Sequence, residues 1–250
     1  VHPFLLRRTK NQVLKELPPR TEVTLEVPQT VEERAVYEAL RRQAVADLED
    51  NPNPIHVLAE LTRLRRACCH PSLVSKSFTG VGSKLQTLLA LLQELKEGGH
   101  RALVFSQFVD HLSLVRRALE AADFSYQYLD GSTPAPARKQ QVKAFQAGQG
   151  DVFLISLKAG GVGLNLTAAD YVIHMDPWWN PAVEDQASDR AHRIGQLRPV
   201  TVYRLVAQNT VEDKIVALHG RKRDLAHSLL EGSEKATRLD AQEMLRLIQD

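Results

Sequence analysis

The hydrophobic positions along the chain change their spacing near residue 100. Before that point they recur at helical intervals, which predicts a helix of about 20 residues reaching Asp50, a second helix ending at His70-Pro71, and a third from Ser83 to Gly98. An alternating stretch over residues 21–27 predicts a short strand ahead of these helices. Later apolar runs predict strands over residues 102–105, 126–129, 152–156, 171–175 and 200–206. Amphipathic stretches between them predict helices near residues 111–122 and 135–147 and from about residue 210.

This alternation indicates the fold class. Continuous apolar strands between amphipathic helices are typical of an α/β domain, in which helices cover both faces of a parallel sheet. Ligands of such sheets bind outside the carboxyl ends of the strands, so the loops that follow the strands are where chemistry is expected. The two helices before residue 71, which are separated by Asn51-Pro52-Asn53-Pro54, predict a helical hairpin set apart from the sheet.

Two local signals mark helix starts. Thr30 with Glu33 forms a capping box, and Ser83 is interpreted as the N-cap of the third helix. Gly82-Ser83-Lys84 is not interpreted as a phosphate loop, because both the G-x-x-x-x-G-K-S/T spacing and a preceding apolar strand are missing.

The stretch DQASDRAHRIGQ, residues 185–196, is predicted to be a short helix that begins at Asn180-Pro181 and stops at Gly195. On that helix three polar residues share one stripe: Gln186, Arg190 and Arg193. Three apolar residues form the adjoining stripe, which is expected to be buried: Ala187, Ala191 and Ile194.

Two arginines held a turn apart suit an anion whose charge is spread over several oxygens. The phosphoryl group transferred in nucleoside triphosphate hydrolysis is such an anion, and positioned charge stabilises its transition state. The alternative is a surface helix whose arginines pair with nearby acidic residues. Spacing alone favours that alternative, so the neighbouring motifs decide between the two.

Three loops after predicted strands carry polar or glycine-rich sequence. Ser106 and Gln107 follow the first sheet strand, and Asp130-Gly131-Ser132-Thr133 follows the second. Ser156 opens the third loop, in which Lys158 adds a cation to three closely spaced glycines: Gly160, Gly161 and Gly163. The loop fails as a dinucleotide fingerprint because Leu166 stands at the third glycine position. A glycine-rich turn alone is weak support for a phosphate site.

Adjacent tryptophans follow the fourth sheet strand. Trp178 and Trp179 cannot share one face, so at least one is expected to be exposed or to contact a partner. A lid on the sheet edge and a platform for nucleic acid are equally compatible with the sequence. His174, in mid-strand, is interpreted as a core or edge histidine with a satisfied ring.

Composition excludes some classes and leaves others open. The chain has 32 basic and 30 acidic residues, a net charge of +2, so any nucleic-acid interface must be a local patch. Without a membrane-length apolar run or a signal-peptide pattern, the chain is expected to be intracellular, in cytoplasm, nucleoid or nucleus. Cys68 and Cys69 lack a second pair, so a helix end is favoured over a metal site and no metal ligand is assigned. Because it opens at Val1 in mid-pattern, the chain is expected to be a fragment of a longer polypeptide.

Taken in order, these motifs resemble the second RecA-like lobe of the Swi/Snf family of superfamily 2 helicase-like ATPases. ALVFSQF resembles helicase motif IV, the segment from Ser156 to Pro181 resembles motif V, and DQASDRAHRIGQ resembles motif VI. LTRLRRACCHP resembles the family's helical protrusion, and TVEDKIVALHGRKRDLAHSLLEG resembles its brace helix. The resulting divisions are a segment continuing from the first lobe (1–28), the protrusion (29–71), a linker (72–82), the second lobe (83–209), the brace helix region (210–232) and a C-terminal helical tail (233–250).

The resemblance also implies roles for individual residues. Arginine fingers for ATP hydrolysis would be Arg190 and Arg193, with Gln186 beside them. The ATP phosphates would be bordered by Gly160, Gly161 and Gly163. Phosphates of a DNA strand would contact Ser106, Gln107, Ser156 and Lys158, and Trp179 would contact duplex DNA. The chain departs from the family at Tyr128 and Lys158, where arginine is common, so a point charge replaces a planar fork at residue 158.

The first lobe of the family is missing from this sequence, which contains no phosphate loop and no acidic Mg²⁺ motif after an apolar strand. ATP with Mg²⁺ would therefore bind mainly to that first lobe of the same polypeptide, and the isolated fragment is predicted to be inactive. The resemblance implies a DNA-dependent ATPase that translocates on duplex DNA, with further protein partners reached through other domains. Two alternatives stay open: a DNA- or protein-binding α/β module without an ATPase role, and the second lobe of an RNA helicase.

Overall fold

A computed structural model describes residues 17–50, 53–159, 163–219 and 241–249. Its centre is a six-stranded sheet with the strand order β1-β6-β5-β2-β4-β3, in which every neighbouring pair is parallel. The strands are β1 (Arg20–Val27), β2 (Ala102–Ser106), β3 (Tyr126–Leu129), β4 (Val152–Ser156), β5 (Tyr171–His174) and β6 (Val200–Ala207). The predicted parallel α/β fold is confirmed, and the strand bounds match the apolar runs to within one residue at each end.

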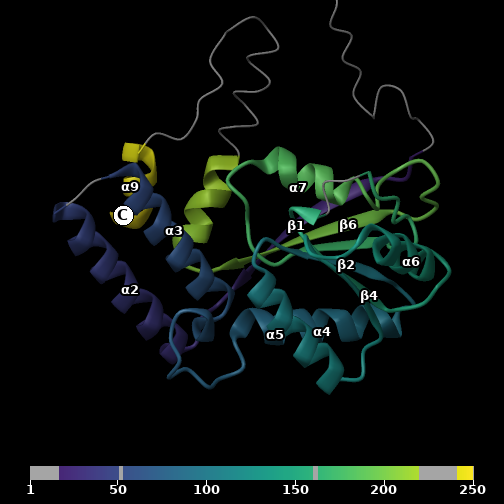
Figure 1. The fold of residues 1–250 in the computed structure, drawn as a ribbon, viewed down its shortest axis with the longest axis horizontal. Coiled ribbons are helices and arrows are strands. Elements are labelled where there is room, and N and C mark those ends of the chain that lie inside the picture. The colour runs from purple at the N-terminus through teal and green to yellow at the C-terminus, as the bar shows by residue number, and fades with distance from the viewer. Residues whose placement is uncertain (1–16, 51–52, 160–162, 220–240, 250) are drawn as a thin grey trace, which may run out of the picture.

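Helices cover both faces of the sheet (Figure 1). On one face, α4 (Ser83–Glu97) and α5 (Val109–Ala121) pack their leucines against apolar side chains of β2, β4 and β5. On the other face, α6 (Ala135–Gln146) and α7 (Pro181–Ser188) contribute Phe145 and Ala187 to a second apolar cluster. Strands β2 and β4 are buried at every residue, which is why their sequences are apolar without alternation.

The N-terminal strand belongs to this sheet. Residues 1–28 were expected to continue from a different lobe, yet β1 pairs with β6 along its whole length, from Arg20 beside Val200 to Val27 beside Ala207. Val27 and Leu205 enter the same apolar cluster as α4 and α5. Strand β1 is therefore an edge strand of the lobe.

The predicted helical hairpin forms beside the sheet, at the left of Figure 1. It consists of α2 (Val31–Asp50) and α3 (Pro54–Cys69), followed by a short 3-10 helix, η2 (Pro71–Leu73). The cysteine pair ends α3, as predicted. Its core is shared with the helix of residues 211–219 through Val211 and Ile215, and with α9 (Ala241–Gln249) through Leu247 and Ile248. The described start of the brace region thus packs on the hairpin, and residues 220–232 lie outside the described part.

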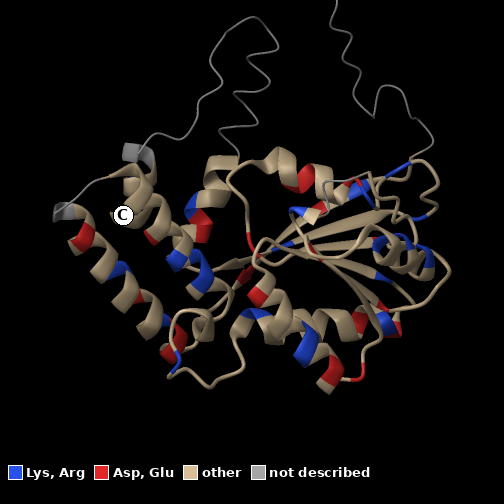
Figure 2. Cartoon of the chain, in the orientation of Figure 1, with Lys and Arg blue, Asp and Glu red and all other residues tan. Residues whose placement is uncertain are grey.

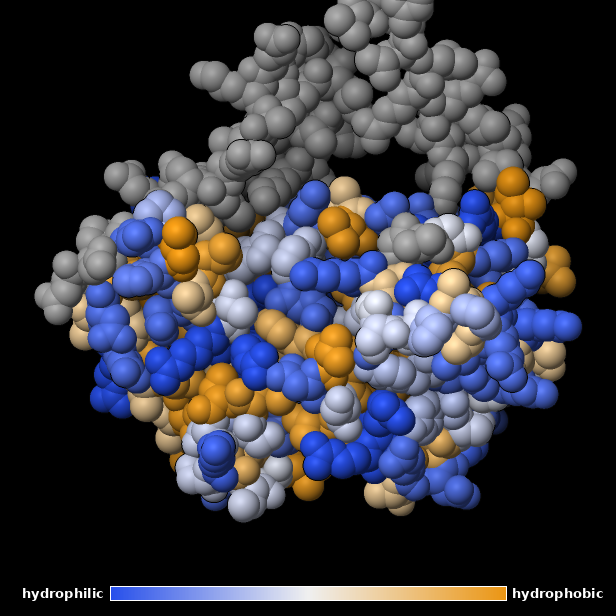
Figure 3. All heavy atoms as spheres, in the orientation of Figure 1, coloured by the Kyte–Doolittle hydropathy of each residue, from blue (hydrophilic) through white to orange (hydrophobic). Residues whose placement is uncertain are grey.

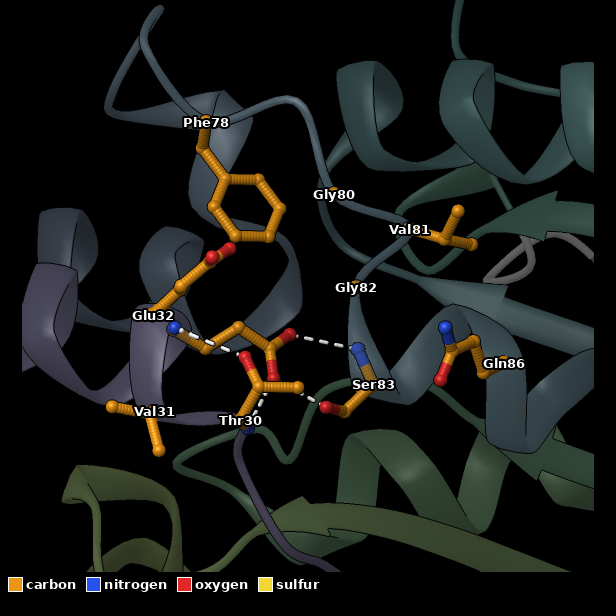
Figure 4. Close-up of a pocket in the computed structure, with 10 residues that line it drawn as sticks. Thr30, Val31, Glu32, Phe78, Gly80, Val81, Gly82, Ser83 and Gln86 are labelled. Atoms are coloured by element: carbon orange, nitrogen blue, oxygen red, sulfur yellow. Dashed lines mark hydrogen bonds between the residues drawn. The ribbon is translucent and has the colours of Figure 1, made fainter.

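The capping box at the start of α2 is confirmed, and the cap predicted for α4 is wrong. Thr30 N donates to a Glu33 carboxylate oxygen at 2.8 Å, and Glu33 N donates to the Thr30 hydroxyl at 3.2 Å. The N-cap of α4 is Gly82, because the Ser83 hydroxyl donates to the Glu33 carboxylate instead of capping its own helix. Figure 4 shows Thr30 and Ser83 facing each other across this junction, beside a shallow cavity lined by Phe78, Val81 and Gln86.

Charged side chains of both signs are spread over the lobe and the hairpin (Figure 2), in keeping with the near-neutral net charge. The face drawn in Figure 3 is mostly hydrophilic, with apolar residues gathered in separate small groups. Among the described residues, no helix combines the length and the apolar character that crossing a bilayer requires.

Candidate functional site

The loops after β2 and β4 begin side by side. Ser106 and Ser156 are register partners at the ends of these strands, and both are almost fully buried. The Ser106 hydroxyl donates to Asp176 at 2.5 Å, and the Ser106 carbonyl accepts from Leu157 N at 2.8 Å. The structure thus brings the two predicted serines together, but it turns their side chains into the protein.

Gln107 and Lys158 lie just beyond these serines in the two loops, and their side chains are less buried. Gln107 is partly exposed, and its backbone N–H donates to the Asp176 carboxylate at 3.2 Å. Lys158 is exposed between two buried neighbours, Leu157 and Ala159, which hold its backbone against the core. The backbone of Lys158 is therefore fixed just after β4, and its side chain is exposed to solvent.

The glycine loop is described only in part. Gly160 and Gly161 lie outside the described residues, so their predicted contacts with ATP phosphates stay predictions. Gly163 is exposed and has φ +46°, a left-handed conformation that side chains other than glycine adopt at a cost in strain. A Cβ atom added to Gly163 would meet no other atom within 4 Å. The positive φ angle, and not a lack of space, is therefore what favours glycine at this position.

The helix predicted over residues 185–196 is shorter than expected. Helix α7 ends at Ser188, and residues 189–196, here called the arginine turn, follow as tight turns in which Arg190 N bonds to Ala187 O and Ala191 N bonds to Ser188 O. These bonds reach back three residues, so the 3.6-residue period is lost. The single-helix stripe of Gln186, Arg190 and Arg193 is therefore wrong. Ile194, expected to be buried, is 69% exposed.

The two arginines nevertheless stay close together. Arg190 is 7% exposed, whereas Arg193 and Gln186 are exposed. Burial lowers the pKa of Arg190, and the positive charge of Arg193 lowers it further, against the opposing effect of Asp189. Arg190 and Arg193 are three residues apart, so both positive charges belong to the same short turn. The arginine turn thus carries two arginines next to one acidic residue, Asp189.

The arginine turn is fastened to the loop that follows the glycines. Leu166 N donates to the Arg190 carbonyl at 3.0 Å. The Gln196 amide donates to the carbonyls of Thr167 and Ala169, at 3.2 and 2.8 Å. The loop after β4 and the arginine turn, which are separate motifs in the sequence, therefore form one continuous surface.

The start of α7 is built as predicted and carries a buried ion pair that the sequence did not reveal. The Asn180 side chain accepts from Ala182 N at 3.1 Å, and Pro181 is the first helical residue. Glu184 accepts from Arg204 Nε and from Trp178 N, each at 2.7 Å. Burial alone would raise the pKa of Glu184, but His174, Arg204 and the Trp178 N–H outweigh burial and lower it.

The tryptophans pack in different places, and neither is exposed: both are partly buried, so the expected exposure of at least one is wrong for this chain alone, and contact with a partner stays a prediction. Trp178 packs against the apolar cluster of the lobe, and Trp179 packs against the core of the helical hairpin. Both rings also lie over the guanidinium of Arg65, at 5.2 and 4.8 Å from ring centroid to Cζ. Sequence reasoning missed Arg65. The signal was its spacing in α3, because residues 57, 61, 64, 65 and 68 share the buried face of that helix.

A second buried ion pair joins α4 to the helix of residues 211–219. Lys84 Nζ donates to Glu212 at 2.5 Å and to the Met175 carbonyl at 2.7 Å. Burial by itself lowers the pKa of Lys84, but the adjacent carboxylate of Glu212 raises it overall. Lys84 is thus a structural cation, in agreement with the rejection of Gly82-Ser83-Lys84 as a phosphate loop.

Within the described residues, one group has the composition of a metal site: Cys69, His111 and Asp176, with ligand atoms within 4.8 Å of one another. Asp176 already accepts from Ser106 and Gln107 and forms an ion pair with Arg65. Burial raises the pKa of the Cys69 thiol well above its ordinary value. A divalent cation here would also face the buried charges of Arg65 and Lys84, so the group does not suit a metal ion.

His174 is a satisfied core histidine, as predicted. It is buried, stacks on Phe105 and shares a hydrogen bond of 2.9 Å with the Ser188 hydroxyl. Burial lowers the pKa of His174 to about 4. His174 therefore helps to seat α7 on the sheet.

Comparison with known proteins identifies the family. A helicase conserved C-terminal domain matches residues 83–195, and an SNF2-related domain matches residues 1–73. The SWI2/SNF2 ATPase core of Sulfolobus solfataricus in complex with double-stranded DNA is 30% identical, with a TM-score of 0.76 over 99% of this chain and 54% of that chain.

The chain belongs to the Swi/Snf family. Within the family it corresponds to the C-terminal, RecA-like lobe: the isolated C-terminal domain of the Sulfolobus solfataricus ATPase has a TM-score of 0.73 at 26% identity over 92% of this chain and 97% of that one.

Curated members of the family are similar over almost the whole chain. A putative ATP-dependent helicase/translocase of Bacillus subtilis is 36% identical over 99% of this chain and 28% of its own length. Human SWI/SNF-related matrix-associated actin-dependent regulator of chromatin subfamily A member 1 is also 36% identical, over 98% of this chain and 25% of its own length. The chain thus spans about a quarter of the length of these relatives.

Proposed function

We propose that this chain is the second motor lobe of a DNA-dependent ATPase that translocates on duplex DNA. In this proposal Arg190 and Arg193 act on ATP whose phosphates and Mg²⁺ are held mainly by the first lobe. The observation that carries the proposal is the arginine turn, which holds Arg190 and Arg193 three residues apart and is hydrogen-bonded to the loop after β4. The names of its relatives, which include ATP-dependent helicases, support the use of ATP.

On the nucleotide side, the chain supplies positive charge and no phosphate loop. Arg193 is exposed and Arg190 is 7% exposed, and both are proposed to act as arginine fingers on the terminal phosphoryl group. Positive charge that is already in position before the reaction stabilises the phosphoryl transition state, because the protein does not have to rearrange as negative charge develops. Gln186, exposed on α7, is proposed to stand beside them, and Gly160, Gly161 and Gly163 to border the phosphates.

On the DNA side, the residues divide by exposure. Lys158 and Gln107 have exposed or partly exposed side chains and are proposed to contact a DNA strand's phosphates. Ser106 and Ser156 have buried side chains, and the Ser106 hydroxyl already donates to Asp176. Ser106 and Ser156 are therefore proposed to act indirectly in DNA binding, by fixing the conformation of the loops after β2 and β4. Trp179 is proposed to contact the duplex.

The two sides act together during turnover. ATP draws the arginine turn toward the first lobe, and hydrolysis removes the charge that holds the lobes together. If each lobe grips phosphates in turn, alternate closing and opening moves the protein along the duplex. Strand separation is not part of the proposal.

The test is the nucleic-acid dependence of ATP turnover by the full-length protein. Turnover is measured without nucleic acid and with matched lengths of duplex DNA, single-stranded DNA and RNA. Strong stimulation by duplex DNA and weak stimulation by the other two is expected. Equal or greater stimulation by RNA would overturn the proposal in favour of an RNA helicase.

A DNA titration of the isolated chain tests the alternative of a stand-alone binding module. A lobe that holds half of an interface is expected to bind duplex weakly and with a steep dependence on salt, since phosphate contacts release counterions. Tight, sequence-selective binding by the isolated chain would favour the module over the motor lobe.

A further inference from the structure

Residues 175–180, here called the tryptophan loop, are held by side chains from four separate helices. Lys84 of α4 donates to Met175 O, and Arg65 of α3 donates to Pro177 O, each at 2.7 Å. Trp178 N donates to Glu184 of α7 at 2.7 Å, and Trp178 O shares a hydrogen bond with His219 of the helix at 211–219. The backbone groups of a loop after a strand commonly form hydrogen bonds to water. Here four of them bond to buried side chains instead, so the loop is expected to be rigid.

Arg65 is the partner that also holds the tryptophan rings. Its side chain is 1% exposed and lies over three rings, with distances from Cζ to the ring centroids of 5.4 Å for Phe108, 5.2 Å for Trp178 and 4.8 Å for Trp179. A planar guanidinium is weakly hydrated and stacks on aromatic faces while its edge donates hydrogen bonds. The ammonium group of a lysine cannot combine these contacts.

The same guanidinium reaches the loop after β2. Arg65 lies 3.6 Å from the Asp176 carboxylate, which accepts hydrogen bonds from the Ser106 hydroxyl and from Gln107 N. Asp176 thereby connects Arg65 to one proposed DNA-contacting loop, while the rings connect it to the other. Both links start from α3 of the helical hairpin.

We infer that Arg65 is a positioning residue through which the helical hairpin sets Trp179 and Gln107 for contact with duplex DNA. This inference rests on the proposed function, because it assumes that Trp179 meets DNA. Arg65 itself does not touch DNA, since its side chain is buried. A change in the packing of α3 alters DNA affinity through Arg65.

The test compares Arg65→Lys with Arg63→Lys in the full-length protein. Arg63 is a matched control two residues earlier on α3, where it contacts Glu60 and Gln43 at the surface. Duplex affinity is measured for both variants, for Trp179→Ala and for the Arg65→Lys/Trp179→Ala double variant. Arg65→Lys is expected to weaken duplex binding roughly tenfold, within the range of couplings between contacting residues, and Arg63→Lys to leave it unchanged. The double variant is expected to bind more weakly than Trp179→Ala by less than the loss seen for Arg65→Lys alone, because only the link through Asp176 to Gln107 then remains.

Tryptophan fluorescence of the 250-residue chain gives a second readout. The sequence has two tryptophans, Trp178 and Trp179, so emission reports on the tryptophan loop alone. Arg65→Lys is expected to increase acrylamide quenching about twofold, because the rings lose the group that holds them. If Arg65→Lys does not fold, Phe108→Leu replaces it in both measurements, since it removes one ring around the guanidinium and leaves the charges in place.

The outcomes separate the inference from the proposed function. If Trp179→Ala weakens duplex binding while Arg65→Lys does not, the inference is wrong and the proposed function stands. Additive losses in the double variant would also overturn the inference, because they indicate a general structural effect. If Trp179→Ala leaves duplex affinity unchanged, the proposed DNA contact fails, and the inference fails with it. Loss with Arg65→Lys and a less than additive loss in the double variant supports the inference.

Discussion

The tryptophan loop and the arginine turn lie on either side of α7 and are stabilised in different ways. Charges around the tryptophan loop are buried and matched: Arg65 faces Asp176, and Lys84 faces Glu212. In the arginine turn, Arg193 is exposed. The first region is built for a fixed geometry, whereas the second keeps positive charge available.

This difference predicts where substitutions act. A buried ion pair is costly to break, because removing one partner leaves the other charge without solvent or a counterion. An exposed arginine contributes little to folding, so its loss affects what it meets from outside. Substitutions around the tryptophan loop are therefore expected to reduce stability, and substitutions of Arg193 to reduce turnover.

The largest effect is expected for Arg190→Ala and Arg193→Ala in the full-length protein. Each is predicted to lower kcat for ATP at saturating duplex DNA by roughly 10³–10⁵, the range associated with arginine fingers. Arg198→Ala, which removes an exposed arginine paired with Asp170, serves as the control and is expected to leave kcat unchanged. Unaltered turnover in both finger variants would remove the basis for the nucleotide site.

A smaller loss is expected for Lys84→Met, this time in stability. Removing the cation leaves Glu212 buried without its partner, which lowers the free energy of unfolding by about 3–5 kcal/mol. Chemical denaturation measures this loss of unfolding free energy. Arg63→Met, which removes the surface ion pair with Glu60, is the control and is expected to lose less than about 1 kcal/mol. Adding Glu212→Gln to Lys84→Met should recover part of the loss. A loss as small as that of the control would show that the pair does not fix the loop.

The free energy of unfolding should fall at acidic pH because of the two buried histidines, His111 and His174. Burial lowers the pKa of His174 from 6.5 to about 4 and that of His111 to about 3. Their neutral forms favour folding, so this stability is present above pH 6.5 and is lost as the pH falls toward 4. Each histidine contributes up to about 1.4 kcal/mol per pH unit in that window.

Denaturation of wild type and His174→Gln between pH 4 and 7.5 isolates the effect of one histidine. The buried carboxyl groups of Asp176 and Glu212, whose pKa values burial raises, act in the opposite direction in both proteins. The difference in slope therefore reports on His174 together with Glu184, whose pKa His174 lowers. Parallel curves for the two proteins would contradict the prediction.

The smallest effect is expected for Lys158→Ala. Loss of one phosphate contact should weaken duplex binding uniformly across sequences and reduce the slope of log K against log salt by about 0.9. Titrations at four salt concentrations measure the slope, and Lys143→Ala on α6 provides a lysine control outside the proposed interface. An unchanged slope would show that Lys158 does not contact DNA.

Much of the fold could be predicted from the sequence. Most strands follow short apolar runs that lie between amphipathic helices, and the capping box of Thr30 and Glu33 marked the start of α2 to the residue. The arginine turn was mispredicted because helical spacing does not reveal hydrogen bonds that reach back three residues. Ser83 was assigned as a cap because its bond to Glu33, 50 residues away, leaves no local signal.

The candidate site residues were chosen from sequence motifs, whereas the side chains that hold them in place could not be predicted. Ser106, Ser156 and Trp179 were identified by residue type, while their exposure and partners depend on packing between distant elements. Arg65 bonds to Pro177, which lies 112 residues away, and Lys84 bonds to Glu212, which lies 128 residues away. No local pattern specifies such pairs, although the buried spacing of Arg65 in α3 was a signal.

The central claim is that this chain brings positive charge to a nucleotide held by another lobe. The most direct measurement is ATP turnover by the 250-residue chain alone, beside the full-length protein, with and without duplex DNA. The account predicts DNA-stimulated turnover by the full-length protein and no turnover above background by the chain. Measurable hydrolysis by the chain alone would contradict it.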